Sequence, residues 1–431
     1  MVIMAQTPSR TPFHYAWVIA AVTFVVLLVT AGIRATPGVL MVPLESEFGW
    51  QRSVLSTAVA INIALFGLIG PFAASVMDRW GLRRVILGAV ALLAASVALT
   101  TQMRNQWELT LLWGVLVGTG TGVTSMVLAA IVATRWFDER RGLVLGVLSA
   151  ANATGQLLFL PLLANLVEAR GWRAATLVVA GAAVVVFAIV LLFMRDRPED
   201  LGLLRYGQVR PDAAHATDRA LTPVAALNRA VRSPAFWILA STFFICGAST
   251  NGLIGTHLIA ACHDYGIPPV RSAALLAAMG IFDIIGTTAS GWLTDRYSSR
   301  HLLFAYYTLR GLALLYLPYT LQSGVDGNLG WFAVFYGLDW IATVPPTVRL
   351  TAEAFGRENT GVIYGWIGAS HQLGASMAAF GAGAIRTALG DYRVAFWLAG
   401  SLCILAGGAF LTVGRRALRP PPVLSGLPSY S

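Results

Sequence analysis

Asp78-Arg79-Trp80-Gly81-Leu82-Arg83-Arg84 forms the first strongly charged break in an otherwise apolar chain. An apolar run from Val54 to Met77 leads into it, and a second run from Val85 to Thr100 follows it. Apolar runs of roughly 20 residues bounded by charge are typical of membrane-spanning helices. The stretch therefore predicts a tight loop between two transmembrane helices, and its three arginines predict that this loop is cytoplasmic.

The same pattern returns about 217 residues later as Asp295-Arg296-Tyr297-Ser298-Ser299-Arg300. In both stretches an arginine stands five positions after the aspartate. A recurring offset of this kind predicts two six-helix bundles that face each other around a central site. Four further pairs of identical residues have nearly the same separation: Trp17 and Trp237, Phe137 and Phe355, Gly146 and Gly365, and Arg173 and Arg393.

The composition is that of an integral membrane protein. Of the 431 residues, 57% are hydrophobic and 12% are charged, whereas about 25% are charged in a typical soluble protein. Long uninterrupted apolar runs favour helices over membrane strands, which would alternate apolar and polar residues. At roughly 30–35 residues per span and loop, the length fits twelve helices. We therefore predict an all-α polytopic membrane protein with twelve transmembrane helices in two pseudo-symmetric six-helix bundles.

Arginine supplies all 30 basic residues, and the net charge is +10. Such a charge would suggest nucleic acid in a soluble protein, but here the arginines lie in short loops, where they indicate topology. Predicted inside segments hold 21 arginines and outside segments hold seven. This bias predicts a multi-pass protein of the bacterial inner membrane with both termini cytoplasmic. The predicted divisions are an N-terminal six-helix bundle (1–194), a cytoplasmic linker (195–233), a C-terminal six-helix bundle (234–414) and a cytoplasmic tail (415–431).

Two local patterns predict how helices pack and bend. Gly114, Gly118 and Gly122 recur every four residues, so they share one helix face on which another helix can approach closely. Pro345-Pro346 interrupts the predicted tenth helix, because consecutive prolines remove two backbone donors. Such a break serves gating in many transporters, and a static bend is an equal alternative.

The charged stretch between the second and third helices resembles the signature of the major facilitator superfamily, G-x-x-x-D-R-x-G-R-R. Ala74 stands in place of the first glycine. The resemblance covers nearly the whole chain and implies secondary transport by alternating access. The second copy departs by having Ser298 in place of the second glycine, and it keeps Gly291, Asp295, Arg296 and Arg300.

Three stretches resemble the monocarboxylate-porter-like branch of that superfamily. They are Arg140-Arg141-Gly142-Leu143-x-x-Gly146, Gly171-Trp172-Arg173 and Gly32-Ile33-Arg34. The branch carries a basic residue for the substrate carboxylate near the place of Arg34. Two features of drug/proton antiporters are missing, namely an arginine ahead of Gly118 or Gly120 and a Gly-Pro…Gly-Gly element in the fifth helix.

Ionisable residues inside apolar spans cost about 2.5–3.5 kcal/mol each on insertion scales, so each one predicts a function or a buried partner. Arg34 is the first candidate for substrate contact, because its guanidinium offers a fixed fork of donors to a carboxylate. The alternative is an arginine that pairs with a carbonyl or reaches toward the outer interface. The residues predicted to bind substrate are Arg34, Asn62, Asn152, Gln156, Arg310 and His371.

Asp283, Arg310 and Asp339 fall near the middles of the eighth, ninth and tenth predicted helices. Two acids and one base can form a partly neutralised network in which a spare carboxyl carries a proton. A structural salt bridge is an equal alternative, which leaves open whether Arg310 is a ligand. Histidines gain and lose protons near neutral pH, although a lone helical histidine such as His371 more often makes a helix–helix hydrogen bond. The residues predicted to couple protons are Asp283, Asp339 and His371.

Both charged repeats are predicted to stabilise one access state by capping or pairing with neighbouring helices. The alternative is that they set topology alone. The residues predicted to gate are Asp78, Arg79, Gly81, Arg83 and Arg84 in the first repeat, and Asp295, Arg296 and Arg300 in the second.

The sequence contains no P-loop, no zinc-ligand spacing and no nucleophile elbow, so we expect no enzyme, no ATP-driven pump, no metal and no cofactor. We predict a secondary active transporter that moves a small organic anion, of the monocarboxylate type, in symport with a proton. The alternative is a proton-coupled exporter of amphipathic compounds. The expected partners are the anion, the proton and the lipid bilayer; we expect no nucleic acid and a monomer.

Overall fold

The computed structural model describes residues 14–208, 223–322, 328–356 and 359–412. The predicted tail (415–431) and part of the predicted linker (209–222) lie outside these residues. The first bundle contains α1 (Ala16–Phe48), α2 (Arg52–Trp80), α3 (Leu82–Thr100), α4 (Gln106–Leu109), η1 (Thr110–Val117), α5 (Gly118–Val123), α6 (Met126–Trp136), α7 (Arg141–Arg170) and α8 (Trp172–Phe193). The second bundle contains α10 (Pro234–Gly247), η3 (Ala248–Ile254), α11 (Gly255–Asp264), α12 (Pro269–Arg296), α13 (Ser299–Gln322), α14 (Asn328–Asp339), α15 (Val344–Phe355), α16 (Thr360–Leu389) and α17 (Arg393–Thr412). Between the bundles lie η2 (Pro198–Leu201) and α9 (Pro223–Ala230).

These elements make twelve membrane crossings, because three crossings are composed of several segments. The fourth crossing is α4–η1–α5–α6, the seventh is α10–η3–α11 and the tenth is α14–α15. Within the described residues, nine crossings are long and apolar enough to span a membrane by composition alone, and α13, α14–α15 and α16 supply the other three. The predicted twelve-helix, two-bundle architecture is confirmed.

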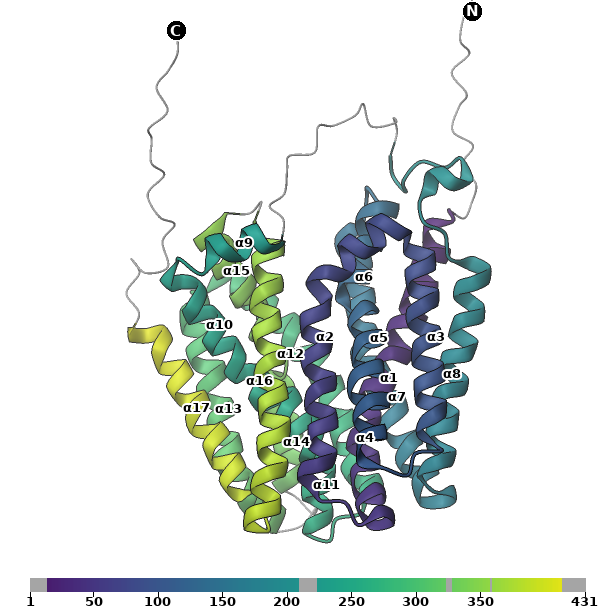
Figure 1. Ribbon diagram of the computed structural model, residues 1–431. Helices are drawn as coiled ribbons and strands as arrows, with labels where there is room; N and C mark the ends of the chain where they lie inside the picture. Colours follow the sequence, from purple (N-terminus) through teal and green to yellow (C-terminus); the bar gives the residue numbers. More distant parts are fainter. Residues whose placement is uncertain (1–13, 209–222, 323–327, 357–358, 413–431) are drawn as a thin grey trace, which may run out of the picture.

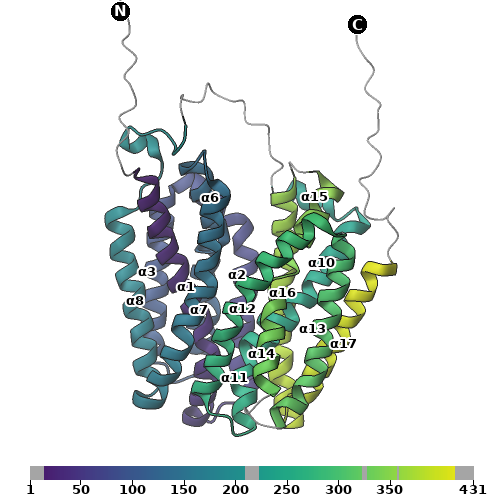
Figure 2. The same ribbon diagram turned by 180° about the vertical axis from the view of Figure 1, so that it is seen from behind.

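The two bundles stand side by side (Figure 1). On one face of the molecule α2 packs against α16, and on the other face α7 packs against α12 (Figure 2). The helix ends at Ala16 and Thr412 lie on the same side of the bundles, which we call the terminal side; the other is the opposite side. A central site is therefore enclosed by helices of both halves of the sequence.

The glycines of the fourth crossing contact α2, as their spacing predicts. A Cβ atom on Gly118 would lie 2.8 Å from the Cα atom of Asn62, and one on Gly114 would lie 3.1 Å from the carbonyl oxygen of Ala58. Gly122 meets Ile69 in the same way. A larger side chain at these positions would push the two helices apart.

The tenth crossing is interrupted, as its two prolines predict. The helix breaks at residues 340–343, and Pro345 and Pro346 stand in the first turn of α15, where their missing N–H groups leave no helical bond unmade. The fourth crossing breaks at Thr124 and Ser125, at the equivalent position of the first repeat, about 217 residues earlier. The internal symmetry therefore extends to the helix breaks, which the sequence did not reveal for the fourth crossing.

Candidate functional site

A cavity of about 50 Å³ lies between the two bundles. Its lining combines apolar side chains with a few polar ones, which is the usual make-up of a small-molecule site. The first bundle contributes Arg34, Ala35, Pro37, Gly38, Val59, Asn62, Ile63, Gln156 and Leu160. The second bundle contributes Asn251, Gly255, Thr256, Leu276 and Trp340.

Arg34 is the one charged residue in the lining that the structure describes. Its guanidinium carbon lies 3.9 Å from the ring centroid of Phe66 on α2, a cation–π contact that orients the side chain. Within the described ranges no carboxylate forms an ion pair with Arg34. The half-buried guanidinium therefore keeps its donors and its charge for another partner.

Helix α1 lacks one backbone hydrogen bond beside Arg34. Pro37 lies inside α1, so the carbonyl of Ile33 lacks its usual helical donor. Gly32 lets α7 approach, because a Cβ atom there would lie 2.5 Å from the ring of Phe159. Arg34 thus lies between a missing helical bond and a tight contact with α7.

Two of the other predicted ligands also line the cavity, namely Asn62 and Gln156. The Asn62 side chain donates through Nδ2 to the backbone carbonyl of Trp113 at 2.7 Å, so it also ties α2 to η1. Asn152 is outside the lining; it lies on α7 one turn nearer the terminal side, on the same helix face as Gln156.

The polar residues that the second bundle contributes to the lining are not among the predicted ligands. Asn251 lies in η3, a π-helical segment of a kind that recurs at functional sites, and Thr256 follows in α11. Ser249, Thr250 and Asn251 form a polar triplet within an apolar run, and this signal could have found them. Trp340 lines the cavity because the break in the tenth crossing releases it from the helix.

Arg310 lies away from the cavity, inside the second bundle, where its side chain is only 1% exposed. Its Nε donates to Asp339 Oδ2 at 2.6 Å, and its Nη1 donates to the sulfur of Cys246 at 2.8 Å. Arg310 therefore joins the ninth crossing to the seventh and the tenth. Its bond to Asp339 is the structural salt bridge that the sequence left as an alternative to a ligand role. His371 also lies outside the cavity lining and packs on Phe243, with 4.8 Å between ring centroids.

Asp283 is separate from this ion pair. Its Oδ1 accepts from the hydroxyl of Thr287 at 2.9 Å and from the backbone N–H of Ile341 at 3.0 Å. No basic side chain among the described residues forms an ion pair with it. The Asp283 carboxyl group therefore holds the turn where the tenth crossing breaks. Trp340, the residue before Ile341 in this turn, lines the cavity.

A polar network joins the bundles on the opposite side. Arg52 on α2 is 4% exposed; its Nε donates to Glu45 at 2.9 Å, and its Nη1 donates to the hydroxyl of Tyr392 at 2.8 Å. Asp264 on α11 lies 3.9 Å from Arg52 and pairs with Arg386 on α16 at 2.6 Å. Arg52 and Arg386 are two of the seven arginines that the sequence places outside; in the structure Arg52 connects the two halves, and Arg386 pairs with Asp264 within the second half.

His257 extends this network inward from Tyr392. Its Nε2 lies 2.8 Å from the carbonyl of Ala379, which can only accept, so Nε2 carries the proton. In the neutral ring Nδ1 then accepts from the Tyr392 hydroxyl, 3.1 Å away. Burial raises the pKa of Tyr392 to about 12, so the hydroxyl retains the proton that it donates. His257 is next to Thr256, and the network therefore reaches the edge of the cavity.

On the terminal side, the charged repeats bond within their own bundles. Asp78 forms an ion pair with Arg135 at the end of α6, and the backbone N–H of Arg83 donates to Asp196 at 2.7 Å. In the second bundle Arg296 lies over the ring of Trp292, and Arg300 donates to the carbonyl of Phe410. Gly81, with a φ of 88°, makes the one-residue turn between α2 and α3. Arg79, Arg84 and Asp295 are exposed.

Comparison with known sequences gives the family. The Major Facilitator Superfamily model matches residues 22–379 and 250–429. The chain is 28% identical over 383 residues to the uncharacterized MFS-type transporter YcxA of Bacillus subtilis (strain 168), covering 87% of this chain and 89% of the relative. It is 26% identical over 406 residues to monocarboxylate transporter 13 of Rattus norvegicus, covering 93% and 89%. It is also 26% identical over 436 residues to monocarboxylate transporter 11 of Mus musculus, covering 95% and 90%.

Solved structures give the same fold. A bacterial homolog of the human lysosomal transporter Spinster, in an inward-facing and unoccupied conformation, aligns with a TM-score of 0.72 at 16% identity, covering 95% of this chain and 99% of that chain. The family match and the monocarboxylate transporters among the relatives confirm the resemblance to the superfamily, drawn from the charged repeats, and to its monocarboxylate-porter-like branch, drawn from three other stretches. The chain is therefore a member of the major facilitator superfamily, a multi-pass membrane transporter and not an enzyme.

Proposed function

We propose that this transporter moves a small organic anion with a single carboxylate, in symport with a proton. The observation that carries the proposal is Arg34, a half-buried guanidinium in the cavity wall with no carboxylate paired to it among the described residues. An unneutralised charge within a membrane is costly unless a partner arrives. A carboxylate is the partner that matches its paired donors, and one arginine suits one carboxylate.

The proposed mechanism is alternating access between the two bundles. The bonds of Arg52 to Tyr392 and of the Ser53 amide to Thr387 link the bundles on the opposite side. On the terminal side, Asp78 of the first repeat bonds within its own bundle, to Arg135. This supports a conformation closed on the opposite side. The arginine bias supports a cytoplasmic terminal side in a bacterial inner membrane, and so an inward-facing state.

Asp283 is the better of the two buried acids for carrying the proton. Asp339 would have to give up Arg310 in order to bind one, whereas no ion pair opposes protonation of Asp283 in the described part of the chain. A proton on Asp283 would weaken its bond to the Ile341 amide, because a neutral carboxyl accepts more weakly than a carboxylate. The weaker bond would loosen the turn at Ile341, and the neighbouring Trp340 in the cavity wall would move with it.

The monocarboxylate transporters of rat and mouse among the relatives support a monocarboxylate as cargo. The second candidate function is export of an amphipathic compound, favoured by an apolar pocket beside Pro37 and Val59. Cargo chemistry separates the two candidates, because only the first requires a charge that Arg34 can bind.

A ligand screen tests the proposal. The unfolding temperature of purified protein in detergent would be measured with a panel of monocarboxylates, dicarboxylates and neutral hydrophobic drugs. The pH would run from about 5 to about 8, which covers the side chains that titrate near neutrality. We expect stabilisation by monocarboxylates, followed by proton-driven flux of the best ligand in proteoliposomes. Stabilisation by the neutral drugs alone would overturn the proposal and favour the exporter.

A further inference from the structure

His257 on α11 is a fully buried titratable side chain, with 0% of its surface exposed. Its Nε2 donates to the carbonyl of Ala379 on α16 at 2.8 Å, and its Nδ1 accepts from the hydroxyl of Tyr392 at 3.1 Å. A neutral ring satisfies both bonds. Imidazole is also the side-chain group that gains a proton closest to neutral pH. Asp283 is the proposed carrier of the transported proton, which leaves His257 available for another role.

The Tyr392 hydroxyl connects His257 to the bond that links the two bundles. It accepts from Nη1 of Arg52 on α2 at 2.8 Å while it donates to His257. We call this bond between Arg52 and Tyr392 the opposite-side gate. A proton on Nδ1 of His257 would turn the acceptor into a donor, and the Tyr392 hydroxyl could no longer donate to it. The hydroxyl would have to turn, and its bond to Arg52 would be disturbed.

The charges around the gate are balanced when His257 is neutral. Arg52 bonds to Glu45, and Arg386 pairs with Asp264, which also lies 3.9 Å from Arg52. Two positive and two negative side chains therefore compensate each other. A proton on His257 would add a positive charge without a partner beside this group, and a buried charge without a partner is costly.

The described elements packed against α11 offer no further acid to neutralise a charged His257. The segment η3 has no titratable side chain. Glu47 on α1 already bonds to Trp172 and Arg173 of the first bundle. The other titratable groups in the halves of α1, α12 and α16 nearest the opposite side are Arg34, Glu45, Arg271 and Arg386. Of these only Glu45 is acidic, and it already holds Arg52.

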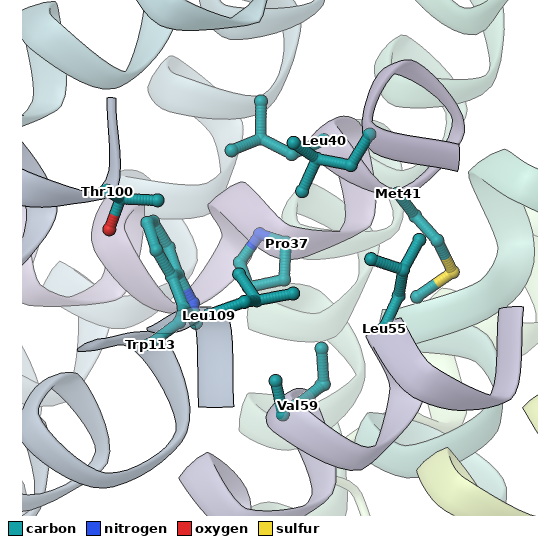
Figure 3. Close-up of a pocket in the computed structure, with 10 residues that line it drawn as sticks. Pro37, Leu40, Met41, Leu55, Val59, Thr100, Leu109 and Trp113 are labelled. Atoms are coloured by element: carbon teal, nitrogen blue, oxygen red, sulfur yellow. The ribbon is translucent and has the colours of Figure 1, made fainter. Parts of the chain in front are cut away.

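Apolar packing covers the gate on its inner side in the first bundle. One helical turn from Glu45 and Arg52, Met41 on α1 and Leu55 on α2 form part of one apolar wall (Figure 3). The two side chains are 2% and 3% exposed. An added charge beside such a wall is poorly solvated, whereas an interface opened to water would solvate it. The closed gate therefore favours the neutral imidazole, and the open gate tolerates the charged one.

We propose that His257 is a proton switch for the opposite-side gate, which closes over the neutral ring and opens when the ring takes up a proton. The inference rests on the alternating access proposed above. With the terminal side cytoplasmic, an acidic exterior would open the cavity to the side from which the anion and its proton enter. The switch proton arrives and leaves on that same side, whereas Asp283 carries the transported proton across.

Labelling of a reporter cysteine at Ser53, beside Arg52, tests the switch. The purified full chain carrying Ser53→Cys would react with a membrane-impermeant maleimide from about pH 5.5 to about pH 8, the range in which imidazole titrates. Only the thiolate reacts, so each rate is divided by that of Leu389→Cys, at an exposed position on the opposite-side end of α16. The rate of the chain without an engineered cysteine is subtracted from both. We expect the ratio to rise at least about threefold from pH 8 to pH 5.5, since one proton can shift the equilibrium by up to about tenfold per pH unit.

Two substitutions of His257 locate the effect. His257→Asn keeps an acceptor near the place of Nδ1, His257→Gln keeps a donor near the place of Nε2, and neither can take up a proton. Both should give a ratio that does not change with pH, whatever its level. His263→Gln, at an exposed position on the same helix, should keep the wild-type profile. A purely structural role of His257 would change the level of the ratio and leave its rise with acid intact.

The outcomes separate the switch from the rest of the account. A ratio independent of pH in the wild-type background, or an unchanged rise in either His257 variant, would overturn the switch. The carboxylate proposal would still stand in that case, because the ligand screen tests it separately. Absence of labelling at Ser53→Cys at every pH, with Leu389→Cys labelled, would overturn opening at this interface, and the switch with it.

Discussion

Arg52 in the first bundle donates to the hydroxyl of Tyr392 in the second bundle across 2.8 Å, and both side chains are buried. The Tyr392 hydroxyl in turn donates to His257, beside the cavity residue Thr256. One hydroxyl therefore joins an ion pair on the opposite side of the interface to the edge of the cavity.

Tyr392→Phe should weaken the closed state. It removes two hydrogen bonds worth about 1 kcal/mol each, which shifts a two-state equilibrium roughly tenfold or more toward the state open on the opposite side. A reporter cysteine at Ser53, beside Arg52, should then react severalfold faster with a membrane-impermeant maleimide. Tyr316→Phe is the matched control, because that ring is exposed on α13. Equal labelling rates in the two variants would contradict the role of Tyr392.

Cross-linking the same interface should stop transport. The backbone N–H of Ser53 donates to the hydroxyl of Thr387 at 3.2 Å, so Ser53→Cys combined with Thr387→Cys brings two thiols together. The native cysteines are all buried, which keeps them from competing. We expect oxidation to abolish uptake and a reductant to restore it, with each single cysteine variant unaffected. Full uptake by the cross-linked protein would refute alternating access at this interface.

The two buried acids should respond differently to the same change. Asp283→Asn should lose proton-driven accumulation while keeping exchange of cargo across the membrane, because binding remains intact. Asp339→Asn should instead destabilise the protein by about 3–5 kcal/mol, since it leaves Arg310 buried without its partner. Paired measurements of accumulation, counterflow and thermal midpoint separate the two outcomes. Proton-driven accumulation that survives in both variants would remove both acids from coupling.

Much of the fold was predictable because it depends on local and repeated features. Apolar runs bounded by arginines predict the spans, and the offset between Asp78 and Asp295 predicts the two bundles. The four-residue glycine spacing predicts the contact of the fourth crossing with α2. These signals are visible in sequence because a membrane demands continuous apolar length and close packing demands small residues.

The cavity was predictable only in part. Arg34, Asn62 and Gln156 stood out as polar residues in apolar runs, and all three line it. Asn251 and Trp340 come to the cavity through a π-helical segment and a helix break, whose side-chain directions helical spacing does not give. The sequence does not decide whether Arg310 binds a ligand or pairs with an acid, because that depends on which helices are neighbours in space.

Close packing inside the second bundle gives a matched pair of stability tests on one helix. A Cβ atom on Gly286 would lie 1.8 Å from the carbonyl oxygen of Leu338, whereas one on Gly291 would meet nothing within 4 Å. Gly286→Ala should therefore lower stability by about 1–3 kcal/mol through forced separation of α12 and α14, and Gly291→Ala should leave it unchanged. Thermal unfolding in detergent measures both; equal midpoints would contradict this packing.

The central claim is that Arg34 binds the carboxylate of the cargo. Its most direct test is uptake of a monocarboxylate, chosen by the ligand screen, into proteoliposomes containing wild-type protein, Arg34→Ala or the control Arg271→Ala, at a residue exposed at the start of α12. We predict that Arg34→Ala loses at least about tenfold in uptake, as expected for loss of a charge-assisted pair, at unchanged protein density, while Arg271→Ala transports normally. Transport by Arg34→Ala at the wild-type rate would contradict the account.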